Sequence, residues 1–214
     1  MKNFLISILL VFSVILVRAQ KIEEVFVKMP DDIIIQLEEA WRKDLVDLYK
    51  SGKTATLENT MQGKSTLLKL TNDYMLLQLT ERSTVELKFL PLVNNTFIIC
   101  MIETVFAPVA DSRVSFYTTE WQLLPSDGLF TADTEDWFWD DNVDRLSTEF
   151  QDASSKLDMY LIKYSLYAEN ANLTAEYMTP HYLYEEHRKN VMPFLKTGVK
   201  TYEWKSGRFE KMYD

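Results

Sequence analysis

The segment from residue 127 to residue 152 holds the densest group of side chains able to do chemistry. It contains nine acids and one basic residue, with a Trp-Phe-Trp run near its centre. Aromatic rings beside polar groups are typical of surfaces that bind a protein or sugar partner. The candidate partner-binding residues are therefore Trp137, Trp139, Asp140 and Asp141.

A structural interpretation of the same segment is also open. Acids stabilise the N-terminal end of a helix, because the backbone dipole places partial positive charge there. In this interpretation the segment is a solvated connection that enters a short helix. Its buried face would be formed by Val143, Leu146 and Phe150.

Calcium is a further alternative for these acids, because it takes six to eight oxygen ligands. The nearest match to a calcium-binding loop is Asp140-x-Asn142-x-Asp144. It departs from the motif twice, since Arg145 stands where a glycine turn is needed and Gln151 replaces the bidentate glutamate. No other cofactor or metal is indicated, and His181 and His187 are six residues apart, which places them on opposite sides of a helix.

Recognisable catalytic motifs are absent from the sequence. There is no Gly-x-Ser-x-Gly nucleophile turn, and Ser112 in Asp111-Ser112-Arg113 is interpreted as a turn residue that opens a strand. The single cysteine, Cys100, lies in an apolar run and is expected to be buried. A glycosidase needs only two carboxylates at a suitable separation, and spacing in the sequence cannot select such a pair among 32 acids. We therefore predict no catalytic residue.

The elements that would position these residues are mostly strands. Residues 31–51 carry an apolar stripe at spacings of three and four, which predicts an amphipathic helix that stops near Gly52. Runs rich in β-branched and aromatic residues then predict two sets of four strands. They span residues 74–79, 84–92, 96–105 and 113–119, and later 159–168, 173–178, 199–205 and 208–212.

This order of elements predicts an α+β fold that is mainly antiparallel, in two meander-like halves. An amphipathic helix would precede the first half, and a short acidic helical connection would join the two. The predicted organisation is residues 1–19 as signal peptide, 20–126 as helix and first meander, 127–152 as connection, and 153–214 as second meander. The two meanders are expected to form one compact unit.

The N-terminus resembles a cleavable secretory signal. Lys2 is followed by 14 uncharged residues, 4–17, and Val17-Arg18-Ala19 suits a signal peptidase that cuts near Ala19-Gln20. As a helix these 14 residues would span about 21 Å, short of the ~30 Å of a bilayer core. The protein is therefore expected to be periplasmic, secreted or at the cell surface, without a transmembrane helix after cleavage. It is not expected to be a lipoprotein, because no cysteine lies at the cleavage point.

Net charge excludes some partners. Cleavage removes two basic residues and no acid, so the mature chain carries 21 basic and 32 acidic residues, a net charge of −11. Nucleic acids and anionic lipid surfaces both require a basic surface, so neither is an expected partner.

Several stretches resemble a family of exported Bacteroidales proteins grouped as a domain of unknown function. They are Asp44–Tyr49, Gly63–Leu68, Leu70–Tyr74, Ser83–Leu92 and Asp111–Tyr117 with Trp121. The resemblance implies an envelope protein of anaerobic Gram-negative bacteria, and it implies no activity. The expected function is therefore a non-enzymatic binding or scaffolding role with a protein or glycan partner in the envelope. The alternative is an envelope hydrolase that acts on polysaccharide or peptide through an unrecognised carboxylate pair.

Overall fold

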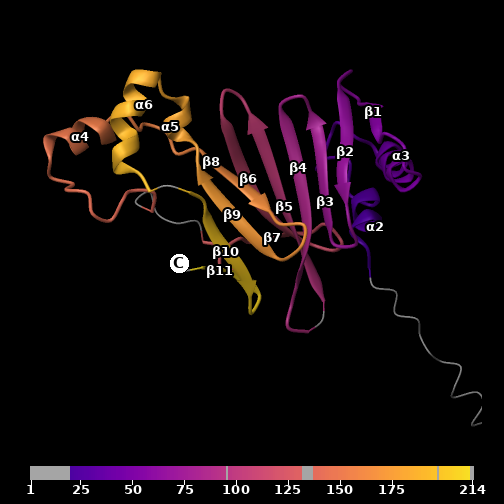
Figure 1. Cartoon of the computed structure of the whole chain (residues 1–214). Coiled ribbons are helices and arrows are strands. Elements are labelled where there is room, and N and C mark those ends of the chain that lie inside the picture. Colours follow the sequence, from indigo (N-terminus) through magenta and orange to yellow (C-terminus); the bar gives the residue numbers. More distant parts are fainter. Residues whose placement is uncertain (1–19, 95, 132–136, 197, 213–214) are drawn as a thin grey trace, which may run out of the picture.

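The computed structural model describes residues 20–94, 96–131, 137–196 and 198–212 (Figure 1). The predicted signal peptide and three of the acids in segment 127–152 lie outside the described residues. The helices are α2 (Ile22–Val27), α3 (Glu39–Lys50), α4 (Thr148–Ser154), α5 (Thr179–Tyr182) and α6 (Glu185–Val191), with a 3₁₀ turn η1 (Met192–Phe194). The strands are β1 (Thr56–Glu58), β2 (Lys64–Leu70), β3 (Tyr74–Thr80), β4 (Ser83–Pro91), β5 (Phe97–Phe106), β6 (Ala110–Thr118), β7 (Leu123–Leu124), β8 (Ile162–Leu166), β9 (Asn172–Tyr177), β10 (Lys200–Lys205) and β11 (Arg208–Lys211).

Two antiparallel sheets form the body, which confirms the predicted α+β class. The first has seven strands in the order β1 to β7, and the second has four in the order β11-β10-β9-β8. The eight predicted strands correspond to β3–β6 and β8–β11. The first sheet has three strands more than predicted, β1, β2 and β7. Their local signals are weak, because β1 and β7 are only three and two residues long and β2 includes Lys64 and Lys69. The outer strands of this sheet are therefore very short at both edges.

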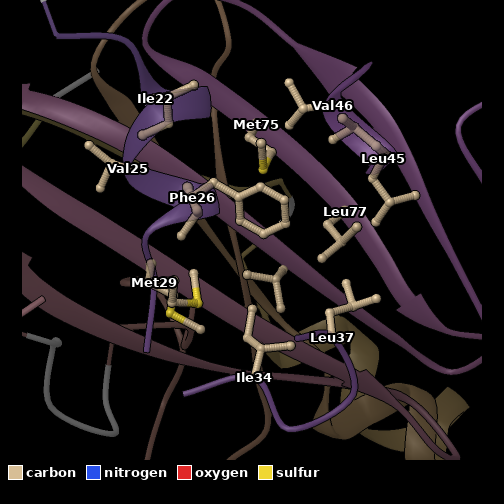
Figure 2. Close-up of a cluster of buried hydrophobic side chains, with 14 of the residues drawn as sticks. Ile22, Val25, Phe26, Met29, Ile34, Leu37, Leu45, Val46, Met75 and Leu77 are labelled. Carbon is tan, nitrogen blue, oxygen red and sulfur yellow. The ribbon is translucent and has the colours of Figure 1, made fainter. Parts of the chain in front are cut away.

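One face of the seven-stranded sheet is covered by α2 and α3. Alternate residues of β3 and β4, such as Met75, Leu77 and Leu87, are fully buried on this face. Figure 2 shows Met75 and Leu77 beside Phe26 from α2 and Leu45 from α3. Fully burying such a side chain contributes roughly 1.5–3 kcal/mol, so this apolar layer is a major source of stability.

The first predicted helix begins later than expected, at Glu39 rather than residue 31. The reason is Arg42, whose guanidinium is fully buried. It donates to the carbonyl oxygens of Val27, Met29 and Leu37 and pairs with Asp31 at 2.9 Å. The residues between α2 and α3 therefore turn their carbonyl oxygens toward the Arg42 guanidinium instead of extending α3. The predicted stop is confirmed, because Gly52 takes a left-handed φ of 70° just after α3.

The opposite face of the seven-stranded sheet packs against the four-stranded sheet. Residues of β5 alternate between the two faces, so Cys100 and Ile102 are buried with Tyr164 and Trp204 of the second sheet. Cys100 is fully buried, as predicted. The two sheets therefore share one apolar core, and Figure 1 shows β8 and β9 lying across β5 and β6.

Polar side chains of the first sheet bind the outer edge of β8. The N–H groups of Ile162, Tyr164 and Leu166 donate to side-chain oxygens at 3.2, 3.1 and 3.0 Å. Their acceptors are Asp111, Ser112 and Glu86, in that order. The interpretation of Ser112 as a turn residue is therefore wrong, since it lies within β6 and accepts a bond from β8.

Two of the groups at this junction are buried charges. Glu86 is 7% exposed and Lys88 is 2% exposed, both on the same face of β4. The Lys88 ammonium donates to the carbonyl oxygen of Ala168 at 2.9 Å and pairs with Asp73 at 2.8 Å. Burial raises the pKa of the Glu86 carboxyl, while hydrogen bonds from Leu166 N–H and the Tyr74 hydroxyl oppose this shift.

The remaining helices form a lobe at the end of the molecule far from α3 (Figure 1). We call α4, α5, α6 and η1 the helical lobe. The acidic connection enters α4 as predicted, but Leu146 is 86% exposed and does not belong to a buried face. The helix begins only at Thr148, because Ser147 is its N-cap and accepts a bond from Phe150 N–H. None of the described helices has the length and apolar content to span a bilayer.

Candidate functional site

A pocket of about 310 Å³ lies where the helical lobe meets the open end of β9 and β10. Its wall is formed by aromatic and aliphatic side chains with three polar ones. We call it the lobe pocket. It is lined by Trp137, Phe138, Glu176, Tyr177, Pro180, His181, Met192, Leu195, Lys196, Gly198 and Val199.

One wall of the lobe pocket is an aromatic stack. The rings of Phe138 and Tyr177 lie parallel, with centroids 3.8 Å apart and planes inclined by 6°. Trp137 meets Phe138 edge-on at 6.0 Å, and its indole N–H donates to the Tyr160 hydroxyl at 2.6 Å. These contacts hold the aromatic wall in one arrangement, so the pocket is preformed.

A short antiparallel contact brings the Trp-Phe-Trp run to this place. Lys196 N–H donates to Phe138 O at 2.8 Å, and Asp140 N–H donates to Phe194 O at 2.9 Å. Trp139, between them, is buried against Phe150 of α4, with ring centroids 4.7 Å apart. Trp139 therefore holds the lobe together from inside, while Trp137 faces the pocket.

A further part of the pocket lining depends on how α5 is anchored. Thr179 is fully buried at the start of this helix. Its hydroxyl accepts from Leu161 N–H and donates to Met159 O, both at 3.0 Å. This fixes Pro180 and His181, the next two residues, at the pocket wall.

The polar side chains at the pocket are mostly engaged in exposed ion pairs. Lys196 pairs with Asp141 at 2.8 Å, and Glu176 approaches Lys163 at 3.7 Å. The hydrogen bond from Lys196 and its positive charge lower the pKa of the Asp141 carboxyl. Exposed pairs of this kind exchange readily with water, so they leave the charges available to a partner.

A lysine lies behind the aromatic wall. The Lys200 ammonium is 5.3 Å from the centroid of the Trp137 ring and 5.5 Å from that of Tyr202. Burial, and then the positive charge of Lys211, lower the pKa of Lys200 to about 8. Its charge and its contact with the Trp137 ring therefore change in mildly alkaline solution.

The acids considered as calcium ligands serve as turn residues. Asp140 Oδ1 accepts from Asn142 N–H at 2.8 Å, and Asp144 Oδ1 accepts from Leu146 N–H at 3.0 Å. Within the described residues, no group of three or more His, Cys, Asp or Glu side chains is arranged to hold a metal ion. Asp140 and Asp144 therefore each use one oxygen to shape the loop.

The structure thus separates the four predicted binding residues. Trp137 lines the pocket, Asp141 lies beside it through Lys196, Asp140 is half-buried in a turn, and Trp139 points into the lobe core. The pocket residues that sequence reasoning missed include Tyr177, Met192 and Val199. Their positions follow from the contact between residues 138–140 and 194–196, for which the sequence has no recognisable signal.

Comparison with known proteins gives a fold and a family. No curated protein matches. A solved structure from Porphyromonas gingivalis W83, described as a domain of an uncharacterized protein, is 30% identical, with a TM-score of 0.82. The match covers 91% of this chain and 100% of that chain. The model of a protein family of unknown function, DUF3256, matches residues 14–209. Because this match spans most of the sequence, the chain belongs to the DUF3256 family, as its resemblance to a Bacteroidales family of unknown function predicted.

Proposed function

We propose that this protein is an exported, non-enzymatic binding protein that captures a protein partner in the cell envelope at the lobe pocket. The observation that carries the proposal is the apolar rim around the preformed pocket. Met192 is 44% exposed and Val199 is 51% exposed, and both line it. Tyr182 and Tyr184, which follow His181, are also exposed. A preformed pocket with exposed apolar neighbours is typical of a protein-binding hot spot.

The pocket suits one large side chain. A volume of about 310 Å³ is at the lower end of the ~300–1,000 Å³ that is usual for small-molecule sites. An apolar side chain inserted here would contact Phe138, Tyr177 and Leu195, while the surrounding chain of the partner would cover Met192 and Val199. Such an anchor, surrounded by contacts that exclude water, contributes most of the affinity in protein interfaces.

A protein partner is favoured over a glycan by the arrangement of the rings. Sugars bind aromatic side chains by stacking on an exposed ring face, but the facing surfaces of Phe138 and Tyr177 are occupied by each other. The exposed rim is formed by Met192 and Val199, whose aliphatic groups pack well against apolar protein side chains. The export part of the proposal is supported by the signal-like residues 1–19.

Site-specific photo-crosslinking tests the function. A photoreactive amino acid replaces Met192 in residues 20–214, and the matched control carries it at Val93, which is exposed on the β4–β5 turn. Each protein is irradiated in the envelope fraction of its native cell. We expect one discrete adduct from position 192 that is lost when Val199→Ser is added. Equal adducts from positions 192 and 93, or none from position 192, would contradict a binding role for the lobe pocket.

The hydrolase alternative is tested with the same protein on a panel of polysaccharides and peptides. Among the described acids only Glu86 is buried, and its raised pKa is a property of general acids. Its Oε2 accepts bonds from Tyr74 and Leu166 at the junction of the two sheets. Turnover that is lost in Glu86→Gln, or in a change of any other single acid, would support the hydrolase and overturn the binding role as the main function.

A further inference from the structure

We propose that the partner segment is basic: one of its large apolar side chains enters the lobe pocket while flanking lysine or arginine side chains contact acids around it. This inference rests on the proposed function and adds the chemistry of the partner. It is carried by the apolar pocket together with the sign of the charge on both sides of it.

The first acidic side is the chain that leads away from the aromatic wall. Residues 140–152 hold five acids against Arg145 alone. The chain is joined to the pocket, because Asp140 bonds to Phe194 and Asp141 pairs with Lys196. It continues into α4, where Glu149 and Asp152 are exposed. A ligand in the pocket would therefore meet carboxylates as soon as its chain passed Lys196.

The second acidic side is the beginning of α6. Glu185 and Glu186 are exposed and follow α5 by three residues, and α5 contributes Pro180 and His181 to the pocket. Only the first turn of α6 is acidic, since its last turn holds Arg188 and Lys189, and Glu185 pairs with Lys189 at 2.7 Å. Both side chains of this pair are largely exposed, so the pair contributes little and a basic partner can replace it.

These two sides select among partners by charge. An acidic segment would be repelled mainly by residues 140–152 and also by the first turn of α6, and a neutral one would gain only the pocket contacts. A basic segment gains attraction that speeds association and that salt weakens. The apolar anchor, in contrast, mainly slows dissociation. Charge and pocket therefore leave different signatures in a binding experiment.

The experiment selects peptides from a random displayed library on immobilised residues 20–214 and measures their affinities by fluorescence anisotropy. The charge variant carries Asp141→Asn, Glu149→Gln and Asp152→Asn. Its matched control carries Glu58→Gln, Glu81→Gln and Glu120→Gln, three exposed acids in β1 and in two turns of the first sheet. The pocket variant carries Met192→Ser and Val199→Ser.

We expect selected peptides with a large apolar residue flanked by lysine or arginine. The charge variant should weaken their binding about tenfold at low salt and reduce its salt dependence, and the control variant should change neither. The pocket variant should weaken binding at every salt concentration.

Other outcomes separate the two proposals. Selected peptides that are neutral or acidic, and that need the pocket, would overturn the basic partner and leave the proposed function standing. Basic peptides that are indifferent to the pocket variant would overturn the proposed function. No selection above an empty support would overturn both.

Discussion

The two faces of the seven-stranded sheet are covered by different means. The face below α2 and α3 presents apolar side chains such as Met75, Leu77 and Leu87 to apolar helix residues. The face toward the second sheet contains Glu86 and Lys88 as well as apolar residues. Glu86 accepts a bond from a backbone N–H of β8, and Lys88 donates to a backbone carbonyl oxygen in the turn after β8. Apolar contact stabilises either layer, but it has little direction. Hydrogen bonds to defined N–H and C=O groups determine where β8 lies on the sheet.

In the helix layer, Arg42 supplies the directional bonds. We expect Arg42→Met to lower the free energy of unfolding by about 3 kcal/mol or more, because several buried carbonyl oxygens lose their donor. Urea unfolding measures the change. Lys43→Met, at the next and exposed position, should change it by less than about 0.5 kcal/mol. Equal effects of the two substitutions would show that apolar packing alone holds this layer.

The polar junction is tested by Lys88→Met. Removal of the ammonium leaves Ala168 O without its donor and Asp73 without its cation. We expect a loss of roughly 2–3 kcal/mol. Amide hydrogen exchange should accelerate in β8 and β9 more than in β3 to β5, since the docking of the second sheet is weakened first. Uniform acceleration would mean that Lys88 does not act specifically on the junction.

Glu86→Gln distinguishes charge from hydrogen bonding at the same place. Burial raises the folded-state pKa of Glu86 above its unfolded value. The native state then binds the proton more tightly, so ionisation of Glu86 lowers stability as pH rises from the unfolded pKa through the raised pKa. Glutamine keeps an acceptor for Tyr74 and Leu166 without charge. We expect the variant to gain stability relative to the native sequence between about pH 4 and neutral pH, as thermal unfolding across pH would show. A constant difference would contradict this assignment.

The smallest effect is expected at the rim of the junction. Lys69 of β2 pairs with Glu169 at 2.9 Å, and both side chains are well exposed. Lys69→Met should change the free energy of unfolding by less than about 0.5 kcal/mol, because water screens such pairs. Urea unfolding in parallel with Lys88→Met gives the contrast between an exposed and a buried lysine. Comparable losses would mean that burial does not determine the contribution of these cations.

Much of the fold could be predicted from the sequence, because its strands carry strong local signals. Strand β5 begins with six apolar residues, Phe97–Ile102, and the turn Ser206-Gly207 marks the final hairpin. The start of α3 could not be predicted, since it depends on a side chain, Arg42, that bonds to residues 5 to 15 positions away. The start of the acidic helix could not be predicted either, because it depends on Ser147 acting as the N-cap. Leu146 therefore precedes the helix and is exposed to solvent.

The candidate site was only partly visible in the sequence. Trp137 and Asp141 belong to a segment of unusual composition, which is why they were selected. Trp139 belongs to the same run but is buried, because it packs against Phe150 of α4. Tyr177, Met192 and Val199 lie about 40 to 60 residues later, in segments that look ordinary on their own. A contact as short as that between 138–140 and 194–196 has no periodicity from which to infer it.

The short outer strands β1 and β7 have a consequence for how copies of the protein behave together at high concentration. A long bare strand at the margin of a sheet invites a neighbouring molecule to add its own strand, which begins aggregation. Here β1 and β7 offer only three and two residues for such pairing, and the outer N–H groups of β8 are already bound by side chains. At these three margins the sheets therefore offer little free backbone to which a second copy of the protein could add a strand.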